Sequence, residues 1–172
     1  FNSMSFWNGA ASIPLYAFNG CNALRLLQFN SYTPPELELA LTGYDFRFNP
    51  SWTEEEELQN LHISIPEGSE GEFIKKWRYP FIGYLDMLDK SAYQYMWDDV
   101  QMKLLYETMR YPSDEEVDAV MYDRLLTSEN RMRAYFGIEN ATEPTEYFPY
   151  RVNEGAGAIT LIGSPSNLQN IF

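Results

Sequence analysis

The sequence has little cysteine and little histidine: Cys21 is its one cysteine and His62 its one histidine. A single cysteine excludes a framework of intrachain disulfides, and one cysteine with one histidine is too small a set for an ordinary structural zinc site. Long apolar runs are missing as well, because the apolar stretches at 10–27 and 156–163 are interrupted or short. A membrane-spanning helix needs ~20 mostly apolar residues, so we expect none.

Basic residues are scarce too, with 12 Lys and Arg against 25 Asp and Glu, for a formal net charge of −13. Nucleic-acid binding needs clustered cations, so we expect no nucleic-acid partner. The 172 residues are 45% apolar and 16% aromatic, which excludes a disordered acidic tail and allows one folded domain, with or without long arms. Because the chain starts at Phe1 and not at methionine, we expect a processed product or a fragment.

The acidity is unevenly distributed along the chain. Residues 1–74 hold two basic and ten acidic residues, for a net charge of −8. Residues 75–136 hold nine basic and eleven acidic residues (net −2), and residues 137–172 hold one and four (net −3). The pattern predicts an acidic arm attached to a body in which both signs of charge are mixed.

The strongest helix signal lies between Ser113 and Gly137. Ser113 and Glu116 have the spacing of a capping box, and acidic residues at the start with arginines near the end suit the helix dipole. Gly137 is placed for a C-cap. We therefore predict a helix over Asp114–Phe136.

Other helices are predicted on weaker signals. A Ser-x-x-Gln cap opens one at 91–111, Pro80 ends another at 72–79, and a capping box of Thr53 and Glu56 opens a short acidic one that ends near Leu61. The 91–111 segment fits helical spacing imperfectly. Its apolar stripe consists of Tyr95, Val100 (or Asp99), Met102, Leu105 (or Tyr106) and Met109.

The remaining segments carry fewer signals. We predict a helical stretch near 22–30, a short helix at 33–43 opened by Pro34-Pro35, an extended segment at 44–52 and a hairpin at 149–162 around 153–157. The fold class predicted is mainly α. It comprises an acidic irregular arm with two short helices at 1–71, a helical body at 72–137, and an irregular tail at 138–172 that could hold the short hairpin.

The candidate catalytic groups form no recognisable motif. His62 is expected to have a structural or surface role, and Cys21 to be a small buried residue, with a pair of the two as the open alternative. The run Glu54–Glu57 is expected to form a solvated face, and Asp98 and Asp99 point about 100° apart in a helix, which does not suit a shared metal ion. We expect no catalytic residue, cofactor or metal, with a small carboxylate-dependent hydrolase as an alternative.

Aromatic residues are abundant, and they permit two interpretations. Tyr79 and Trp97, with Trp77, belong to a ring-rich middle segment that could dock on a partner or fill a core. We favour docking. Asn140-Ala141-Thr142 is a glycan acceptor sequence, which leaves open an extracellular or viral structural or binding module as another alternative.

The order of residues between Glu72 and Ala134 carries a family resemblance. Its elements are Ile74-Lys75-Lys76-Trp77-Arg78-Tyr79, Gly83-Tyr84, Met96-Trp97-Asp98-Asp99, Met109-Arg110-Tyr111-Pro112, Asp123-Arg124 and Arg131-Met132-Arg133-Ala134. This segment resembles subunit 7, the small matrix-side subunit of the mitochondrial cytochrome bc1 complex. The arm at 1–71 and the tail after 150 have no counterpart there, and the family is usually basic.

The resemblance implies a helical, peripheral accessory subunit of the respiratory chain, without a catalytic residue. Such subunits lie on the matrix side of the mitochondrial inner membrane, contact other protein subunits, and reach the membrane only peripherally through them. The docking residues that it implies are Lys75, Lys76, Trp77, Arg110, Arg124, Arg131 and Arg133. For each basic residue the alternative is a solvated charge on an exposed helix face. From the sequence we thus expect a non-catalytic assembly subunit of an electron-transport complex.

Overall fold

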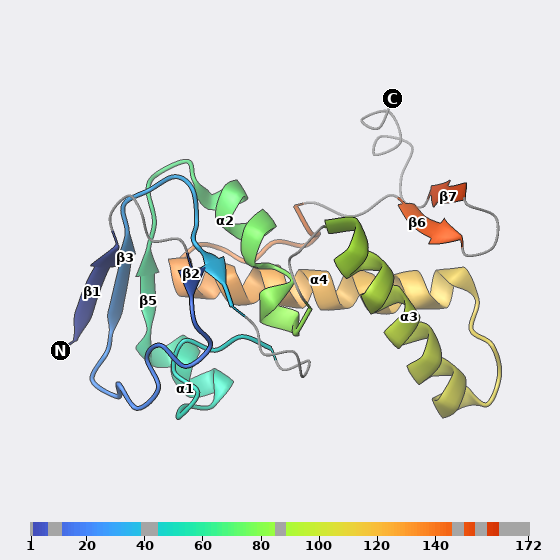
Figure 1. Cartoon of the computed structure of the whole chain (residues 1–172), viewed down its shortest axis with the longest axis horizontal. Coiled ribbons are helices and arrows are strands. Elements are labelled where there is room, and N and C mark those ends of the chain that lie inside the picture. Colours follow the sequence, from blue (N-terminus) through green and yellow to red (C-terminus); the bar gives the residue numbers. More distant parts are fainter. Residues whose placement is uncertain are drawn as a thin grey trace.

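The computed structural model describes residues 2–6, 12–38, 45–84, 89–145, 150–153 and 158–161 (Figure 1). Within these residues the fold is mixed α/β. Four α-helices and one 3-10 turn combine with seven short strands.

A three-stranded parallel sheet lies at one end of the structure (Figure 1). Its strands, in spatial order, are β1 (Ser3–Phe6), β3 (Leu26–Phe29) and β5 (His62–Ser64). The register aligns Met4 with Leu27 and Leu27 with Ile63, so these side chains share one face of the sheet. Leu27 and Ile63 are buried, whereas His62 on the opposite face is exposed.

Two smaller sheets account for the other strands. β2 (Ser12–Ile13) pairs with β4 (Glu36–Leu37) in parallel, and β6 (Tyr150–Asn153) pairs with β7 (Ala158–Leu161) antiparallel. The second pair confirms the hairpin predicted at 149–162. Its turn at 154–157 lies outside the described residues.

Two short helices follow the sequence signals closely. α1 (Glu54–Asn60) begins at the predicted capping box, in which Thr53 Oγ1 accepts from the Glu56 N–H and the Glu56 side chain accepts from the Thr53 N–H. α2 (Glu70–Trp77) starts two residues earlier than predicted. A 3-10 turn, η1 (Pro80–Ile82), then begins at the proline expected to end α2.

α3 (Asp89–Thr108) and the start of α4 (Asp114–Phe136) form the other end of the structure, and α4 runs from there back to the main sheet (Figure 1). α4 has the predicted bounds, with its capping box at Ser113 and a left-handed Gly137 (φ 70°) at its end. α3 begins before the predicted cap at Ser91 and ends before Tyr111.

Two apolar clusters hold these elements together, and α4 contributes to both. The first packs the main sheet, α2 and η1 against the C-terminal end of α4, with Trp77 among the rings of Phe29, Phe48 and Phe73. The second packs α3 against the N-terminal half of α4. Its buried members are Tyr79, Ala92, Tyr93, Met96, Trp97, Val100, Val117, Met121 and Leu125.

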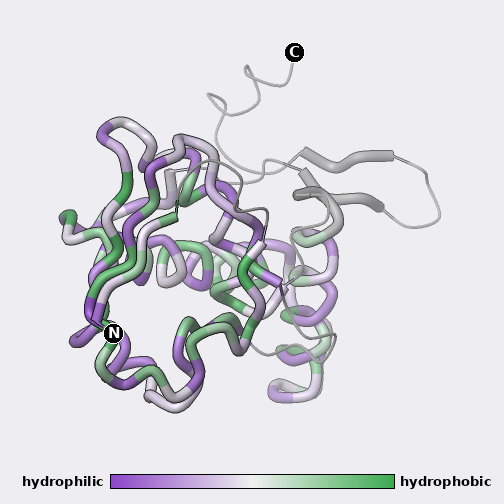
Figure 2. Tube along the Cα trace, turned by 60° about the vertical axis from the view of Figure 1, so that its left-hand side comes forward, coloured by the Kyte–Doolittle hydropathy of each residue, from purple (hydrophilic) through white to green (hydrophobic). Residues whose placement is uncertain are grey.

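Apolar and polar residues are interspersed along the tube in Figure 2. Consistent with this, no helix among the described residues is both long enough and apolar enough to cross a membrane.

The predicted mainly α fold with an irregular N-terminal arm is wrong. The segments 22–30 and 33–43, predicted to be helical, contain β3 and β4. Pro34-Pro35 predicts a helix start, but a proline also favours extended backbone in the residue before it. Strands of two to four residues are too short for their period to show in a sequence, and tertiary pairing determines them.

Candidate functional site

The three aromatic residues predicted to contact a partner lie in the core. Trp77 and Tyr79 have no exposed surface, and Trp97 is 4% exposed. Trp77 also donates from its indole nitrogen to the Pro35 carbonyl at 2.8 Å. Their rings therefore pack within this chain and present no surface to a partner in this structure.

Most of the basic residues predicted to contact a partner form ion pairs with carboxylates of this chain. Lys75 is exposed. The pairs other than those of Arg131 are Lys76 with Glu36 (3.3 Å), Arg110 with Glu116 (2.6 Å), Arg124 with Asp99 (3.2 Å) and Arg133 with Glu70 (2.8 Å). Such pairs contribute little to stability when exposed, and they lower the net positive charge that a partner would meet.

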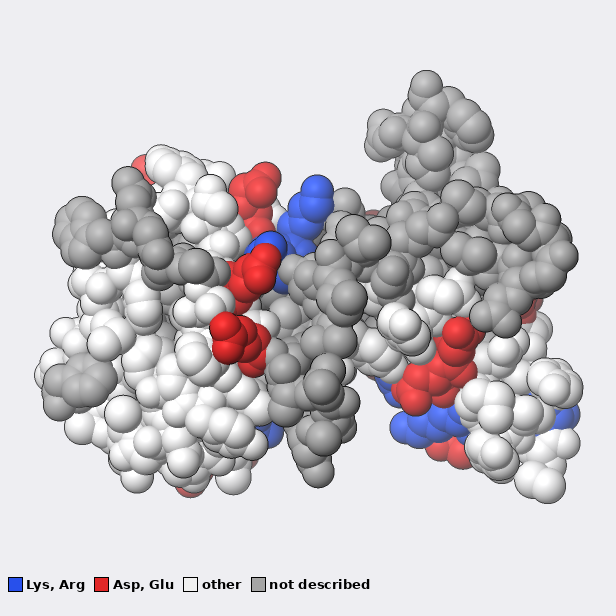
Figure 3. Space-filling model, in the orientation of Figure 1, with Lys and Arg blue, Asp and Glu red and all other residues white. Residues whose placement is uncertain are grey.

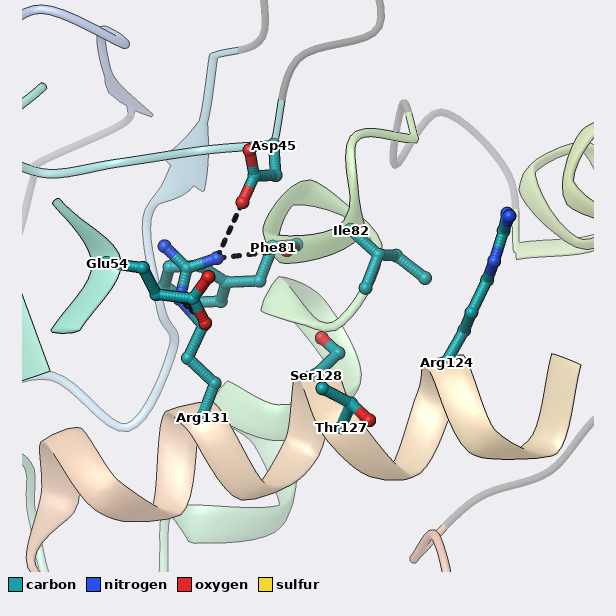
Figure 4. Close-up of a pocket in the computed structure, with 8 residues that line it drawn as sticks. All are labelled: Asp45, Glu54, Phe81, Ile82, Arg124, Thr127, Ser128 and Arg131. Atoms are coloured by element: carbon teal, nitrogen blue, oxygen red, sulfur yellow. Dashed lines mark hydrogen bonds and ion pairs between the residues drawn. The ribbon is translucent and has the colours of Figure 1, made fainter. Parts of the chain in front are cut away.

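A cleft of about 340 Å³ lies along one face of α4 (Figure 4). Helical spacing brings Arg124, Thr127, Ser128 and Arg131 to this face, at positions i, i+3, i+4 and i+7. The other walls come from Asp45, Glu54, Phe81 and Ile82. In Figure 4 the two arginines lie at opposite ends of the cleft and do not converge on one point.

Arg131 closes one end of the cleft, and its side chain is 4% exposed. Its guanidinium donates to Asp45 at 3.0 Å, to the Phe81 carbonyl at 3.1 Å and to the Phe46 carbonyl at 2.9 Å. It also lies 4.7 Å from the centre of the Phe81 ring. Three segments of the chain thus meet at this one buried cation, which gives Arg131 a structural role.

A second buried polar group lies close by in the core. Glu57 accepts hydrogen bonds from the Phe48 N–H (3.1 Å), the Asn49 N–H (3.2 Å) and the Tyr135 hydroxyl (2.6 Å). Burial raises the pKa of Tyr135 well above its ordinary value, and Glu57 acts in the same direction, so the phenol stays protonated and donates. The network fixes the loop before α1 to the end of α4.

Several carboxylates around the cleft thus have partners within this chain: Glu57 in the core, and Asp45 and Glu54 at Arg131. The expectation that Glu54–Glu57 forms a solvated face is wrong for Glu57, which is fully buried, while Glu56 caps α1. Beside Arg124, burial and the hydrogen bond to Asp99 raise the pKa of Tyr84 to about 12. Among the described residues, no three His, Cys, Asp or Glu side chains form a group that could hold a metal ion.

The most unusual surface of the described chain lies on α3. Tyr95, Met102, Tyr106 and Met109, which we call the α3 surface, are 44% to 85% exposed. Their spacing of seven, four and three residues places Tyr95, Met102 and Tyr106 on one side of the helix, and Met109 directly follows its last residue, Thr108. The opposite side of α3 is the one that packs on α4. Tyr111, just beyond the helix, is exposed as well.

Sequence reasoning found part of this surface and missed its orientation. Tyr95, Met102 and Met109 were identified as an apolar stripe, but a second set at Tyr93, Met96, Trp97 and Val100 forms the buried face. Because α3 has apolar residues on both sides, the spacing of apolar residues in its sequence fits a helix poorly. That irregularity was the available signal for a surface with a function beyond folding.

His62, Cys21 and the residues of the glycan acceptor sequence lie outside the cleft and the α3 surface. His62 is exposed beside Gly137, and Cys21 is half-buried against the first cluster and has a free thiol. Asn140 and Thr142 are exposed in the segment after α4. The glycines at 155 and 157, expected to form a turn, lie outside the described residues.

Comparisons with protein-family models, with curated proteins and with solved structures find no match for this chain. The function proposed below therefore depends on the chain's own residues.

Proposed function

We propose that this chain is a non-catalytic subunit of a larger protein assembly and that it docks on a partner protein through the α3 surface. The observation that carries the proposal is a line of exposed tyrosine and methionine side chains on a helix whose opposite side is already packed. Tyrosine and methionine are enriched at protein interfaces, where the apolar body of the side chain is buried and its polar tip finds a partner.

Exposure on this scale is unfavourable for a chain that remains alone. Large apolar side chains that line up on a surface mark interaction sites or promote aggregation. The α3 surface extends from Tyr95 on α3 to Met109, the residue directly after the helix, and these 14 steps along the chain correspond to about 21 Å at ~1.5 Å per residue. A partner segment of several helical turns could cover it.

The backbone at Met109 supports the same proposal. Met109 has φ 58°, in the left-handed region that glycine normally occupies after a helix, and its side chain is 85% exposed. A residue with a side chain is disfavoured there by about 1 kcal/mol. Since the side chain gains almost no burial within the chain, a contact outside the chain would explain why methionine stands at this position.

The experiment is a measurement of native mass in gentle extracts of the producing cells. Wild type is compared with a variant that carries Tyr95→Ser, Tyr106→Ser and Met109→Gly, and with a control that carries Tyr16→Ser and Tyr32→Ser at two tyrosines of similar exposure. We expect wild type and control to migrate in a large assembly and the α3 variant near the 20.1 kDa of the free chain. An α3 variant that stays in the assembly would refute the proposal.

A narrower form of the proposal makes the assembly a respiratory complex of the cytochrome bc1 type. Its support is the resemblance of residues 72–134. Several residues that the resemblance implies as docking groups are paired or buried within this chain, so the α3 surface would carry the contact in their place. Co-migration with cytochrome b in mitochondrial extracts is expected, and a chain found outside mitochondria would contradict this form.

A second candidate is an extracellular or virion module, favoured by one observation: both Asn140 and Thr142 of the acceptor sequence are exposed. Mass spectrometry of the native protein decides between the two. Glycan at Asn140 would support this candidate and contradict a mitochondrial location, whereas an unmodified Asn140 in a secreted form would count against it.

A further inference from the structure

The α3 surface is not uniformly apolar, because two carboxylates interrupt it. Asp98 and Asp99 lie three and four residues after Tyr95, which places them beside it on the helix and before Met102. Asp98 is exposed, and among the described residues its one hydrogen bond comes from Gln94 at 2.9 Å. A carboxylate has room for several donors, so Asp98 can accept further hydrogen bonds.

The wider surroundings are acidic as well. Residues 94–118 hold seven carboxylates against Lys103 and Arg110, for a net charge of −5. Charged side chains of both signs gather on the α3 part of the face shown in Figure 3. Arg124 of α4 forms an ion pair with Asp99 at 3.2 Å. Unlike Asp99, Asp98 has no basic partner among the described residues. Glu107 is also exposed.

We infer that the partner docked on the α3 surface is a protein segment with an amphipathic helix, and that an arginine at one end of this helix binds Tyr95 and Asp98. This inference rests on the function proposed above. The guanidinium would stack on the Tyr95 ring while its N–H groups donate to the Asp98 carboxylate. Apolar residues of the same helix would cover Met102, Tyr106 and Met109, over a length of about 21 Å.

The charges decide among the possible occupants. A second copy of this chain would bring Asp98 and the surrounding net negative charge against their like, which disfavours self-association. An anionic membrane would be repelled for the same reason. Arginine suits the site better than lysine, because its planar group can stack on a ring and donate to a carboxylate at the same time.

The test uses three synthetic peptides of 18 residues, each a leucine-rich amphipathic helix that ends in a pair of arginines, lysines or glutamates. Binding to the purified full chain is measured by fluorescence anisotropy. We expect the arginine peptide to bind about fivefold more tightly than the lysine peptide, and the glutamate peptide to bind weakest. Tyr95→Leu should remove the preference for arginine over lysine, and Asp98→Asn should weaken both basic peptides.

Matched controls separate this site from general attraction to an acidic protein. Tyr16→Leu alters a tyrosine of similar exposure (64%, against 66% for Tyr95), and Glu72→Gln removes an exposed charge from α2. Both controls should bind like wild type. Equal binding of the three peptides, or tighter binding to phosphatidylglycerol vesicles than to the arginine peptide, would overturn the inference.

Failure of this inference and failure of the proposed function give different results. If none of the three peptides binds wild type, the arginine site is wrong, while the native-mass experiment still decides whether the α3 surface docks. If the α3 variant stays in the native assembly, the proposed function itself is wrong.

Discussion

Replacing Arg131 by methionine tests whether this residue holds the fold together, as its contacts indicate, or serves a partner. Methionine keeps the unbranched stem that packs beside Phe81 and removes every hydrogen bond of the guanidinium. The loss leaves two carbonyls of buried residues, at Phe46 and Phe81, without their donor. A buried carbonyl left unsatisfied costs about 1–3 kcal/mol.

The carboxylates that pair with Arg131 add less to the loss. Asp45 and Glu54 are 41% and 44% exposed, so water can solvate them once the cation is gone. We therefore expect the free energy of unfolding to fall by about 3 kcal/mol, with the two carbonyls as the main cause. That is a large share of the ~5–15 kcal/mol by which a domain is stable.

Urea unfolding followed by tryptophan fluorescence measures this loss, since Trp77 lies in the same apolar cluster as Phe81. The control is Arg110→Met, which removes an exposed arginine that pairs with Glu116. The control should lose much less stability. If Arg131→Met loses no more than the control, Arg131 has no structural role of the kind described, and its predicted role in contacting a partner becomes the better explanation.

Three further predictions concern backbone and charge. Gly71→Ala in α2 should raise the free energy of unfolding by about 0.5–1 kcal/mol, because the added Cβ meets open space. Gly137→Ala should lower it by about 1 kcal/mol, because alanine is strained at φ 70°. If urea unfolding shows that both variants change the free energy of unfolding in the same direction, this prediction is wrong. Met109→Gly should stabilise the isolated chain by about 1 kcal/mol and yet weaken partner binding, and a loss of stability would contradict the left-handed backbone there. The Arg110 guanidinium and the Ser113 N–H lower the pKa of Glu116 to about 2 from 4.5. The stabilisation that ionised Glu116 provides is present above pH 4.5 and is lost as the pH falls through 2. The urea midpoints of wild type and Glu116→Gln should therefore converge as the pH is lowered from 4.5 to 2. A difference between the two midpoints that stays constant over this range would refute the prediction.

The helix ends could be predicted from the sequence because their signals are local. Ser113 and Glu116, like Thr53 and Glu56, are three residues apart, and each pair forms the reciprocal hydrogen bonds expected of a capping box. Gly137 adopts the left-handed conformation that its position after α4 suggested. Such features need only a few neighbouring residues to form, so the sequence contains all the information that determines them.

The strands could not be predicted in the same way, because their partners are distant in the sequence. Leu26–Phe29 pairs in parallel with Ser3–Phe6 on one side and His62–Ser64 on the other. Each strand alone is too short for a period of two to be recognised. Burial of Leu27 and Ile63 under the helices, which only the assembled fold provides, determines the register.

Part of the α3 surface could be predicted from the sequence. Tyr95, Met102 and Met109 have helical spacing, but spacing cannot tell which of two apolar faces turns to the core. The answer depends on α4, where Val117, Met121 and Leu125 pack against the other face. The buried role of Glu57 was hidden for a similar reason, since its partners are the loop at Phe48 and the distant Tyr135.

The central claim, that the α3 surface is covered by a partner protein, is tested most directly by the oxidation rates of its methionines. Met102 and Met109 are exposed in the isolated chain, Met4 on β1 is also exposed, and Met96, Met121 and Met132 are buried. With dilute peroxide and mass spectrometry, Met102 and Met109 should oxidise readily in the isolated chain and slowly in the native assembly, while Met4 oxidises at the same rate in both. Equal rates for Met102 and Met109 in the assembly and in the isolated chain would contradict the claim.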